Sequence, residues 1–138
     1  MGSFGRNQAG TSAIEFAFVA PVLLLLLLGI MGYGYVFGIY HSVQQMAAEA
    51  ARSSVAGLSD AERARIAQDY VAAHADAYAF IDPAKVKVRT LQTGPQRQDF
   101  EVAVSYDMTG SLYDRLSLLV ALPQPLIERR AVVQRGGY

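Results

Sequence analysis

The sequence predicts a membrane-anchored α+β protein, in which a long N-terminal transmembrane helix extends into a small domain with a second helix and a roughly three-stranded antiparallel sheet. Three observations predict this class. Residues 16–40 are uncharged and strongly apolar, helical spacing of apolar residues continues beyond them, and the spacing changes to every second residue from residue 85. With 138 residues, the chain has room for one such helix and one small domain.

The transmembrane prediction depends on residues 16–40, whose centre is the run Leu23–Leu28. At ~1.5 Å per residue, a helix over this stretch is roughly 37 Å long, enough to cross a ~30 Å hydrocarbon core with some tilt. A cleaved signal peptide fits poorly, because the apolar stretch is about twice the usual ~7–15 residues. Aromatic residues follow at its far end, as expected at a membrane interface: Tyr33, Tyr35, Phe37 and Tyr40.

Glu15 lies directly before the apolar stretch. An ionised carboxylate deep in a bilayer costs at least ~2.5–3.5 kcal/mol on insertion scales, so a buried Glu15 would be a candidate functional residue. In the alternative interpretation, Glu15 lies in the headgroup layer, where its charge costs little. Position alone does not separate the two.

Proline and glycine interrupt the apolar helix at specific places. Pro21 removes a backbone hydrogen bond and crowds the preceding turn, so a kink is expected there. Gly34 and Gly38 form a GxxxG spacing, which allows two helix backbones to approach closely. This spacing is common by chance in apolar helices, and helix packing there is a hypothesis.

Helical spacing continues beyond the membrane stretch. One helix is predicted over residues 11–56, ended by Gly57, and residues 57–138 then form the small domain. Ser59 and Glu62 form a capping box that begins a second helix, predicted to end near Ile81 because Pro83 follows.

The rest of the domain is predicted to consist mainly of strands, at residues 85–91, 100–106 and 126–134, with turn residues at 93–96. A basic row on the first strand is expected to face an acidic row on the second; the rows are Lys85, Lys87 and Arg89, and Asp99, Glu101 and Asp107. Binding of the basic row to lipid headgroups is the alternative to a solvated strand face.

Between the second and third strands, helical spacing returns in a short amphipathic piece made of Leu112, Leu116, Leu119 and Val120. It is ended by Pro123 and Pro125. Such a piece packs on the hairpin, lies on the membrane or meets a partner protein. The sequence leaves these three alternatives open.

The composition argues against several classes of function. Zero net charge does not favour a nucleic-acid partner, and the absence of cysteine excludes thiol chemistry and cysteine metal sites. His41 and His74 lie far apart in sequence without ligand-spaced carboxylates, whereas a metal site needs at least three ligands. No catalytic, phosphate-binding or calcium-binding motif is present. The sequence therefore predicts a non-enzyme without cofactor, metal or small-molecule substrate.

The segment Gly10–Phe16, GTSAIEF, resembles the processing site of type IV pilin-like precursors, in which a prepilin peptidase cuts after a glycine and glutamate is the fifth mature residue. The match is closer to the TadE-like family, the pseudopilins of the tight-adherence (Tad, or Flp) pilus. It is carried by Arg6, Gly10, residues 13–19, Pro21 and the leucines that follow. The alanine-rich stretch Ala47–Arg52 is similar to that family's A-x-x-x-A-R continuation.

The resemblance implies that residues 1–10 are a leader removed by a prepilin peptidase between Gly10 and Thr11. It implies a single-pass protein of the bacterial inner membrane, with the N-terminus in the cytoplasm and the domain in the periplasm. Its partners would be the peptidase, other pilin-like subunits and the Tad assembly platform. Whether it enters the filament or stays at its base is left open.

The resemblance also assigns Glu15, with the adjacent Phe16, a role in assembly. Cleavage would create an ammonium group at Thr11, which Glu15 of a neighbouring subunit could pair with inside the helix bundle. Such a buried pair favours a defined register more than it favours stability. The rival hypothesis is an uncleaved single-pass scaffold of a secretion or envelope complex. An anchored enzyme, the third alternative, lacks a catalytic constellation.

Overall fold

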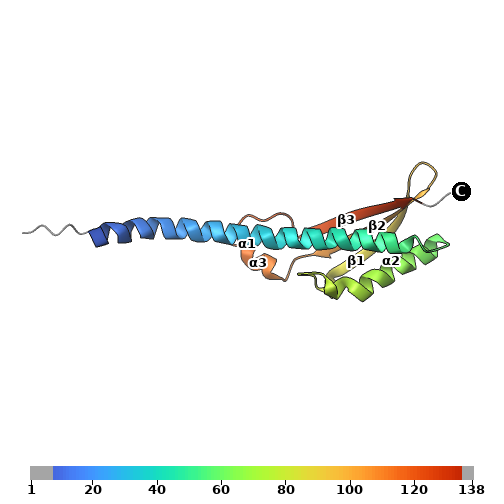
Figure 1. Ribbon diagram of the computed structural model, residues 1–138, viewed down its shortest axis with the longest axis horizontal. Helices are drawn as coiled ribbons and strands as arrows, with labels where there is room; N and C mark the ends of the chain where they lie inside the picture. The colour runs from blue at the N-terminus through green and yellow to red at the C-terminus, as the bar shows by residue number, and fades with distance from the viewer. Residues whose placement is uncertain (1–7, 135–138) are drawn as a thin grey trace, which may run out of the picture.

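The computed structural model describes residues 8–134; most of the predicted leader and the end of the chain lie outside this range. Figure 1 shows one long helix with the other elements gathered beside its C-terminal half. This arrangement confirms the predicted α+β fold class. In chain order, the helices and strands are α1 (Gln8–Ser54), α2 (Asp60–His74), β1 (Val86–Thr93), β2 (Asp99–Asp107), α3 (Leu112–Ser117) and β3 (Leu126–Gln134).

The three strands form one antiparallel sheet in the order β1-β2-β3, as predicted. One face of the sheet packs against α1, because every second residue of β2 is apolar and α1 presents apolar residues at helical spacing. The fully buried side chains from these two elements include Val36, Ile39, Val43 and Met46 of α1 and Val102, Val104 and Tyr106 of β2. The C-terminal half of α1 is therefore the central element of the domain core.

Helix α1 begins three residues before its predicted start and ends two residues before its predicted end. Nothing in Gln8 or Ala9 opposes helix, so the first turn extends past Gly10. At the other end the chain tightens into i→i+3 hydrogen bonds, the last of which runs from Gly57 N to Ser54 O (3.0 Å). Such tightening is a usual way for a helix to end.

The beginning of α2 is as predicted, but its predicted end near Ile81 is wrong. Ser59 Oγ accepts a hydrogen bond from Glu62 N (3.2 Å). In the other direction, Glu62 Oε2 accepts a hydrogen bond from Leu58 N (2.9 Å) rather than from the backbone N–H of the cap residue. The helix ends at His74, where a 3₁₀ turn follows, and Phe80 with φ of 64° then redirects the chain. Pro83 begins a second short 3₁₀ turn and is not the residue that stops α2.

The strand boundaries differ from the predicted ones by one or two residues, and β3 has the predicted bounds. The hairpin turn contains Gly94 with φ of 90°, a backbone conformation that glycine adopts without strain. Helix α3 ends at Ser117, so Leu119 and Val120 lie in the turn after it.

The close ion pairs of the sheet run to β3. The predicted facing of the basic and acidic rows holds at Asp107, whose pKa is lowered by hydrogen bonds from Thr109 and also by the charges of Lys85 and Lys87. Arg89 is opposite Ala103, whose small side chain lets it reach Glu128 (Nη2 to Oε2, 2.9 Å). Glu101 pairs with Arg130 of β3 (3.3 Å), which also binds Glu128 (2.7 Å). The predicted rows lie on the first two strands only. The result is a network of alternating charges across the outer face of the sheet.

Because of this network, part of the stability of the domain depends on pH. Hydrogen bonds from Arg130 and then from Arg89 hold the pKa of Glu128 below its ordinary value of 4.5. A lowered pKa in the folded state means that the contribution is present above the ordinary value and is lost as pH falls through the lowered one. We therefore expect the urea midpoint of the Glu128→Gln variant to fall less steeply than that of wild type between about pH 7 and about pH 3.

The control for this titration is Asp69→Asn, which changes an exposed carboxylate of α2. Its acid dependence should match that of the wild type. Equal slopes for wild type and Glu128→Gln would show that the Glu128 contacts do not contribute to stability.

Candidate membrane and assembly site

The N-terminal half of α1 extends beyond the domain and exposes its apolar side chains. Over residues 10–31 no described residue is buried, and the large apolar side chains from Phe18 (76% exposed) to Leu27 (47%) remain open. The helix is long and apolar enough to cross a membrane. Exposed apolar area of this extent is unfavourable in water, which indicates a membrane anchor.

The predicted cleavage and assembly residues lie at the exposed end of this helix. Gly10 and Thr11 are in its first turns, and Glu15 and Phe16 follow, all of them exposed. Thr11 and Glu15 are four residues apart and therefore share one face of the helix, whereas Phe16 points about 100° away from Glu15. These residues lie on the part of α1 that extends beyond the domain.

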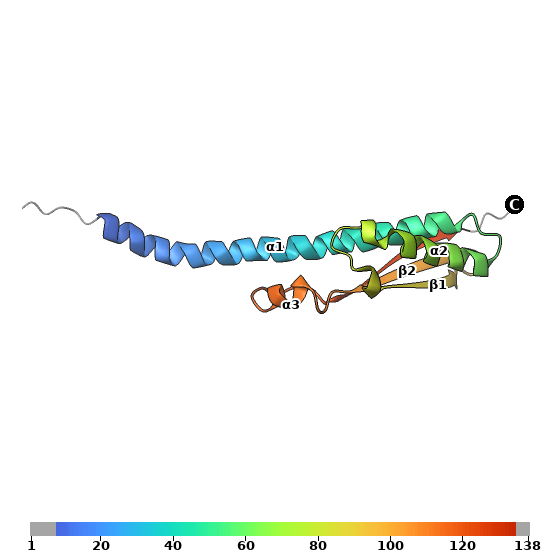
Figure 2. The same cartoon turned by 90° about the horizontal axis from the view of Figure 1, so that it is seen from below.

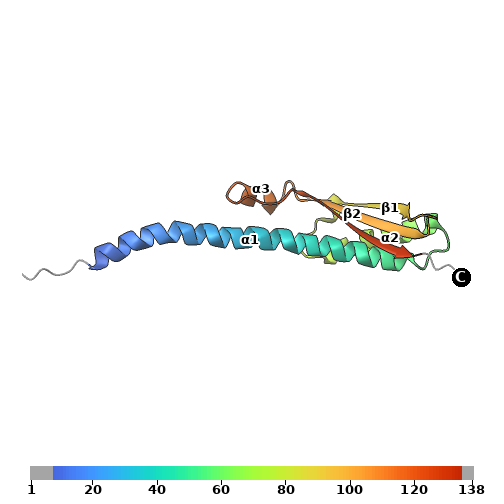
Figure 3. The same ribbon diagram turned by 90° about the horizontal axis from the view of Figure 1, so that it is seen from above.

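The helix continues through Pro21, which lies in its exposed half. Figures 2 and 3 show that the N-terminal, blue part of α1 curves away from the axis of the rest. A proline inside a helix is a common cause of such a bend, since it removes one backbone hydrogen bond.

The two glycines of the GxxxG spacing have different surroundings. A side chain at Gly34 would meet nothing within 4 Å. A Cβ at Gly38 would lie 3.2 Å from the ring of Phe80, so this glycine accommodates a side chain of its own domain. A second helix could meet Gly34 directly, but at Gly38 it would also meet Phe80.

The aromatic residues expected at the far interface also hold the domain together. Tyr33 and Tyr35 donate hydrogen bonds to the region of α3. Tyr40 lies under the guanidinium of Arg129, 4.9 Å from the ring centre, in a cation–π contact. Phe37 keeps 58% of its surface exposed. No local pattern in the sequence indicates the contacts with β3 and α3, because they join residues far apart in the chain.

The two histidines lie closer together than the sequence indicated, since both line one shallow groove between α1 and α2. His74 Nδ1 donates to Tyr70 O (2.8 Å), and the His74 ring stacks on that of Tyr70. No group of three His, Asp or Glu suited to a metal ion occurs within residues 8–134. The histidine pair alone falls short of the three ligands that zinc sites use.

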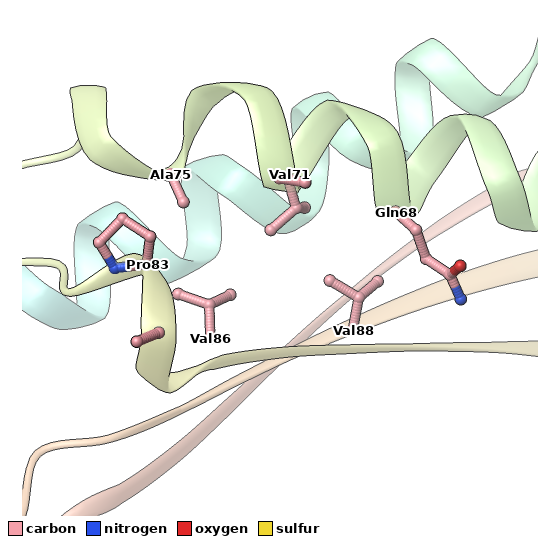
Figure 4. Close-up of a pocket in the computed structure, with 8 residues that line it drawn as sticks. Gln68, Val71, Ala75, Pro83, Val86 and Val88 are labelled. Carbon is pink, nitrogen blue, oxygen red and sulfur yellow. The ribbon is translucent and has the colours of Figure 1, made fainter.

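A second groove, of about 500 Å³, separates α2 from β1. In Figure 4, Val71 and Ala75 face Val86 and Val88 across it, and Gln68 lies at one side. Its walls are formed by apolar side chains and one amide, with no acid, base or nucleophile among them. This groove offers no group for catalysis.

A long exposed apolar helix that carries a small α+β domain is an architecture that indicates a membrane anchor. Residues 10–52 of the chain match the family model described as TadE-like protein. This match confirms the family resemblance predicted from the sequence, over the stretch from Gly10 nearly to the end of α1. No curated protein and no solved structure matches the chain.

Proposed function

We propose that the protein is a pseudopilin that takes part in the assembly of Tad (Flp) pili. In this proposal, α1 anchors it in the bacterial inner membrane with the N-terminus in the cytoplasm and the domain in the periplasm. A prepilin peptidase cleaves it between Gly10 and Thr11. The observation that carries the proposal is the TadE-like match, which begins at Gly10 and includes Glu15 and points to a Tad pilus-associated protein.

The position of Gly10 supports cleavage there. It is exposed, and it lies in the first turn of α1. The first four N–H groups of a helix have no partner within the helix, and helix ends fray. The first turn of α1 can therefore unwind and present the peptide bond after Gly10 to a peptidase in an extended conformation. The domain is not disturbed, because the buried residues of α1 begin only at Gly32.

The structure of the domain supports a structural role. Its sheet and second helix pack against the C-terminal half of α1 and leave the apolar half uncovered for the membrane or for other helices. TadE-like proteins are pilus-associated structural proteins. The interaction partners of this chain would then be other pilin-like subunits and the Tad assembly platform.

The test is the N-terminus of the protein isolated from native membranes, together with that of a Gly10→Val variant. The expected mature chain begins at Thr11, and the variant is expected to keep its leader because valine is bulkier at the cleavage position. Gly29→Val is the matched control, since a side chain at Gly29 also meets nothing within 4 Å. It should be processed like the wild type.

An intact N-terminus in the wild type, in cells with active prepilin peptidase, would contradict the proposal. That result would favour the second candidate, an uncleaved single-pass scaffold of a secretion or envelope complex. The candidate has its own support in the structure, because α1 and the domain form one folded unit whether or not the leader is removed.

A further inference from the structure

Residues 111–122, here called the α3 segment, lie beside the middle of α1 and farther toward its N-terminal end than the sheet does (Figures 2 and 3). Two hydrogen bonds fix this level. Tyr33 Oη donates to Ala121 O (2.8 Å), and Tyr35 Oη donates to Ser111 Oγ (3.1 Å). Both ends of the segment are thus attached to one turn of α1.

Close packing reinforces this attachment. A Cβ at Gly32 would lie 3.0 Å from Cδ2 of Leu122, so the absence of a side chain there lets Leu122 approach the helix. Tyr113 and Leu116 are buried, and Tyr113 Oη donates a hydrogen bond to Pro123 O. The α3 segment is therefore a packed part of the fold with a defined position along α1.

Three leucines of the same segment remain exposed. Leu112 is 47% exposed, Leu119 58% and Leu118 85%. Asp114 and Arg115 lie between them in sequence and are also exposed. Exposed leucines on a short helix and on the turn after it, with charged side chains beside them, suit a segment that lies in the plane of a membrane surface.

The length of the exposed part of α1 places the exposed leucines of the α3 segment near the level of the membrane boundary. The stretch 16–31 is about 24 Å long as a helix, shorter than a ~30 Å hydrocarbon core. Val36 and Ile39, farther along, are fully buried in the domain and unavailable to lipid. If Glu15 marks one edge of the core, about 30 Å of helix ends near Tyr35, the level at which the α3 segment is attached.

We propose that the α3 segment inserts its exposed leucines into the lipid interface and so fixes the depth and orientation of the domain on the membrane. Lipid is the occupant because the segment continues the exposed apolar surface of α1 at the level where that surface would otherwise end short of the bilayer boundary. The proposal requires that α1 crosses a membrane, and it holds whether or not Gly10 is cleaved.

The chain has no cysteine, so a single one can be introduced and labelled. The experiment uses the full chain with Leu118→Cys, carrying an environment-sensitive fluorophore, in vesicles of phosphatidylcholine and phosphatidylglycerol. Quenching is measured with lipids that carry a nitroxide at a shallow acyl position and, separately, with aqueous iodide. Leu58→Cys is the matched control, because Leu58 is 94% exposed in the turn between α1 and α2 at the opposite end of the domain.

The expected result is blue-shifted emission at position 118, several-fold stronger quenching by the nitroxide lipid than at position 58, and weaker quenching by iodide. A second labelled variant, Leu119→Cys, should behave like Leu118→Cys. Equal iodide access at 118 and 58 would overturn the proposal, since the segment would then stand in water. Protection from both quenchers that disappears at high lipid-to-protein ratio would also overturn it, in favour of a second copy of the chain.

Discussion

Replacement of Glu15 by glutamine is expected to reduce assembly by about two to four orders of magnitude while leaving membrane insertion intact. Under the proposed function, Glu15 neutralises the Thr11 ammonium of a neighbouring subunit among packed apolar helices. Glutamine keeps the size of the side chain and removes its charge. An ammonium group left buried without its carboxylate costs about 3–5 kcal/mol, which accounts for the size of the expected loss. Insertion should not suffer, because a neutral amide enters a bilayer more easily than a carboxylate does.

The assay compares the amount of protein in membranes with the amount crosslinked to other pilin-like subunits and with surface piliation. The matched control is Glu49→Gln, which changes another glutamate of α1. Glu49 forms an i,i+3 pair with Arg52 (3.5 Å) at the surface, and such pairs contribute little. Normal crosslinking and piliation in the Glu15→Gln variant would show that this carboxylate has no role in register. Glu15 would then be interpreted as a headgroup-layer residue.

The elements that could be predicted from the sequence are those whose signals are local. The long uncharged stretch specifies α1, the period of two specifies the strands, and Ser59 with Glu62 specifies the start of α2. The end of α2 could not be predicted in this way. A proline gives a latest possible stop, whereas the actual end at His74 depends on packing against α1 and on a backbone turn at Phe80.

The same distinction applies to the site. The Gly10 to Glu15 spacing is local, and the sequence alone identified it. The position of the α3 segment depends on hydrogen bonds from Tyr33 and Tyr35 to residues 76 or more positions away, so no local pattern predicts what the segment packs against. The ion pairs of Arg89 and Arg130 likewise required the register of β3, which no local pattern gives.

Replacement of Ile39 by alanine is expected to destabilise the domain by about 2–5 kcal/mol, a large part of the ~5–15 kcal/mol typical of a folded domain. Ile39 is fully buried on the face of α1 that packs against the sheet, so its loss leaves a cavity among residues that cannot fully collapse. The measurement is urea unfolding of the full chain in detergent micelles. It is followed by tyrosine fluorescence, since the chain has eight tyrosines and no tryptophan.

Ile30→Ala on the same helix is the matched control, because Ile30 is 63% exposed in the half that projects from the domain. Both changes raise helix propensity equally, so the difference between them isolates packing. Ile30→Ala should shift the unfolding free energy by less than about 0.5 kcal/mol. Equal losses in the two variants would mean that the domain does not fold around the C-terminal half of α1. A large loss for Ile39→Ala alone would show that one continuous helix serves two environments, with the change from lipid to protein core lying between Ile30 and Ile39.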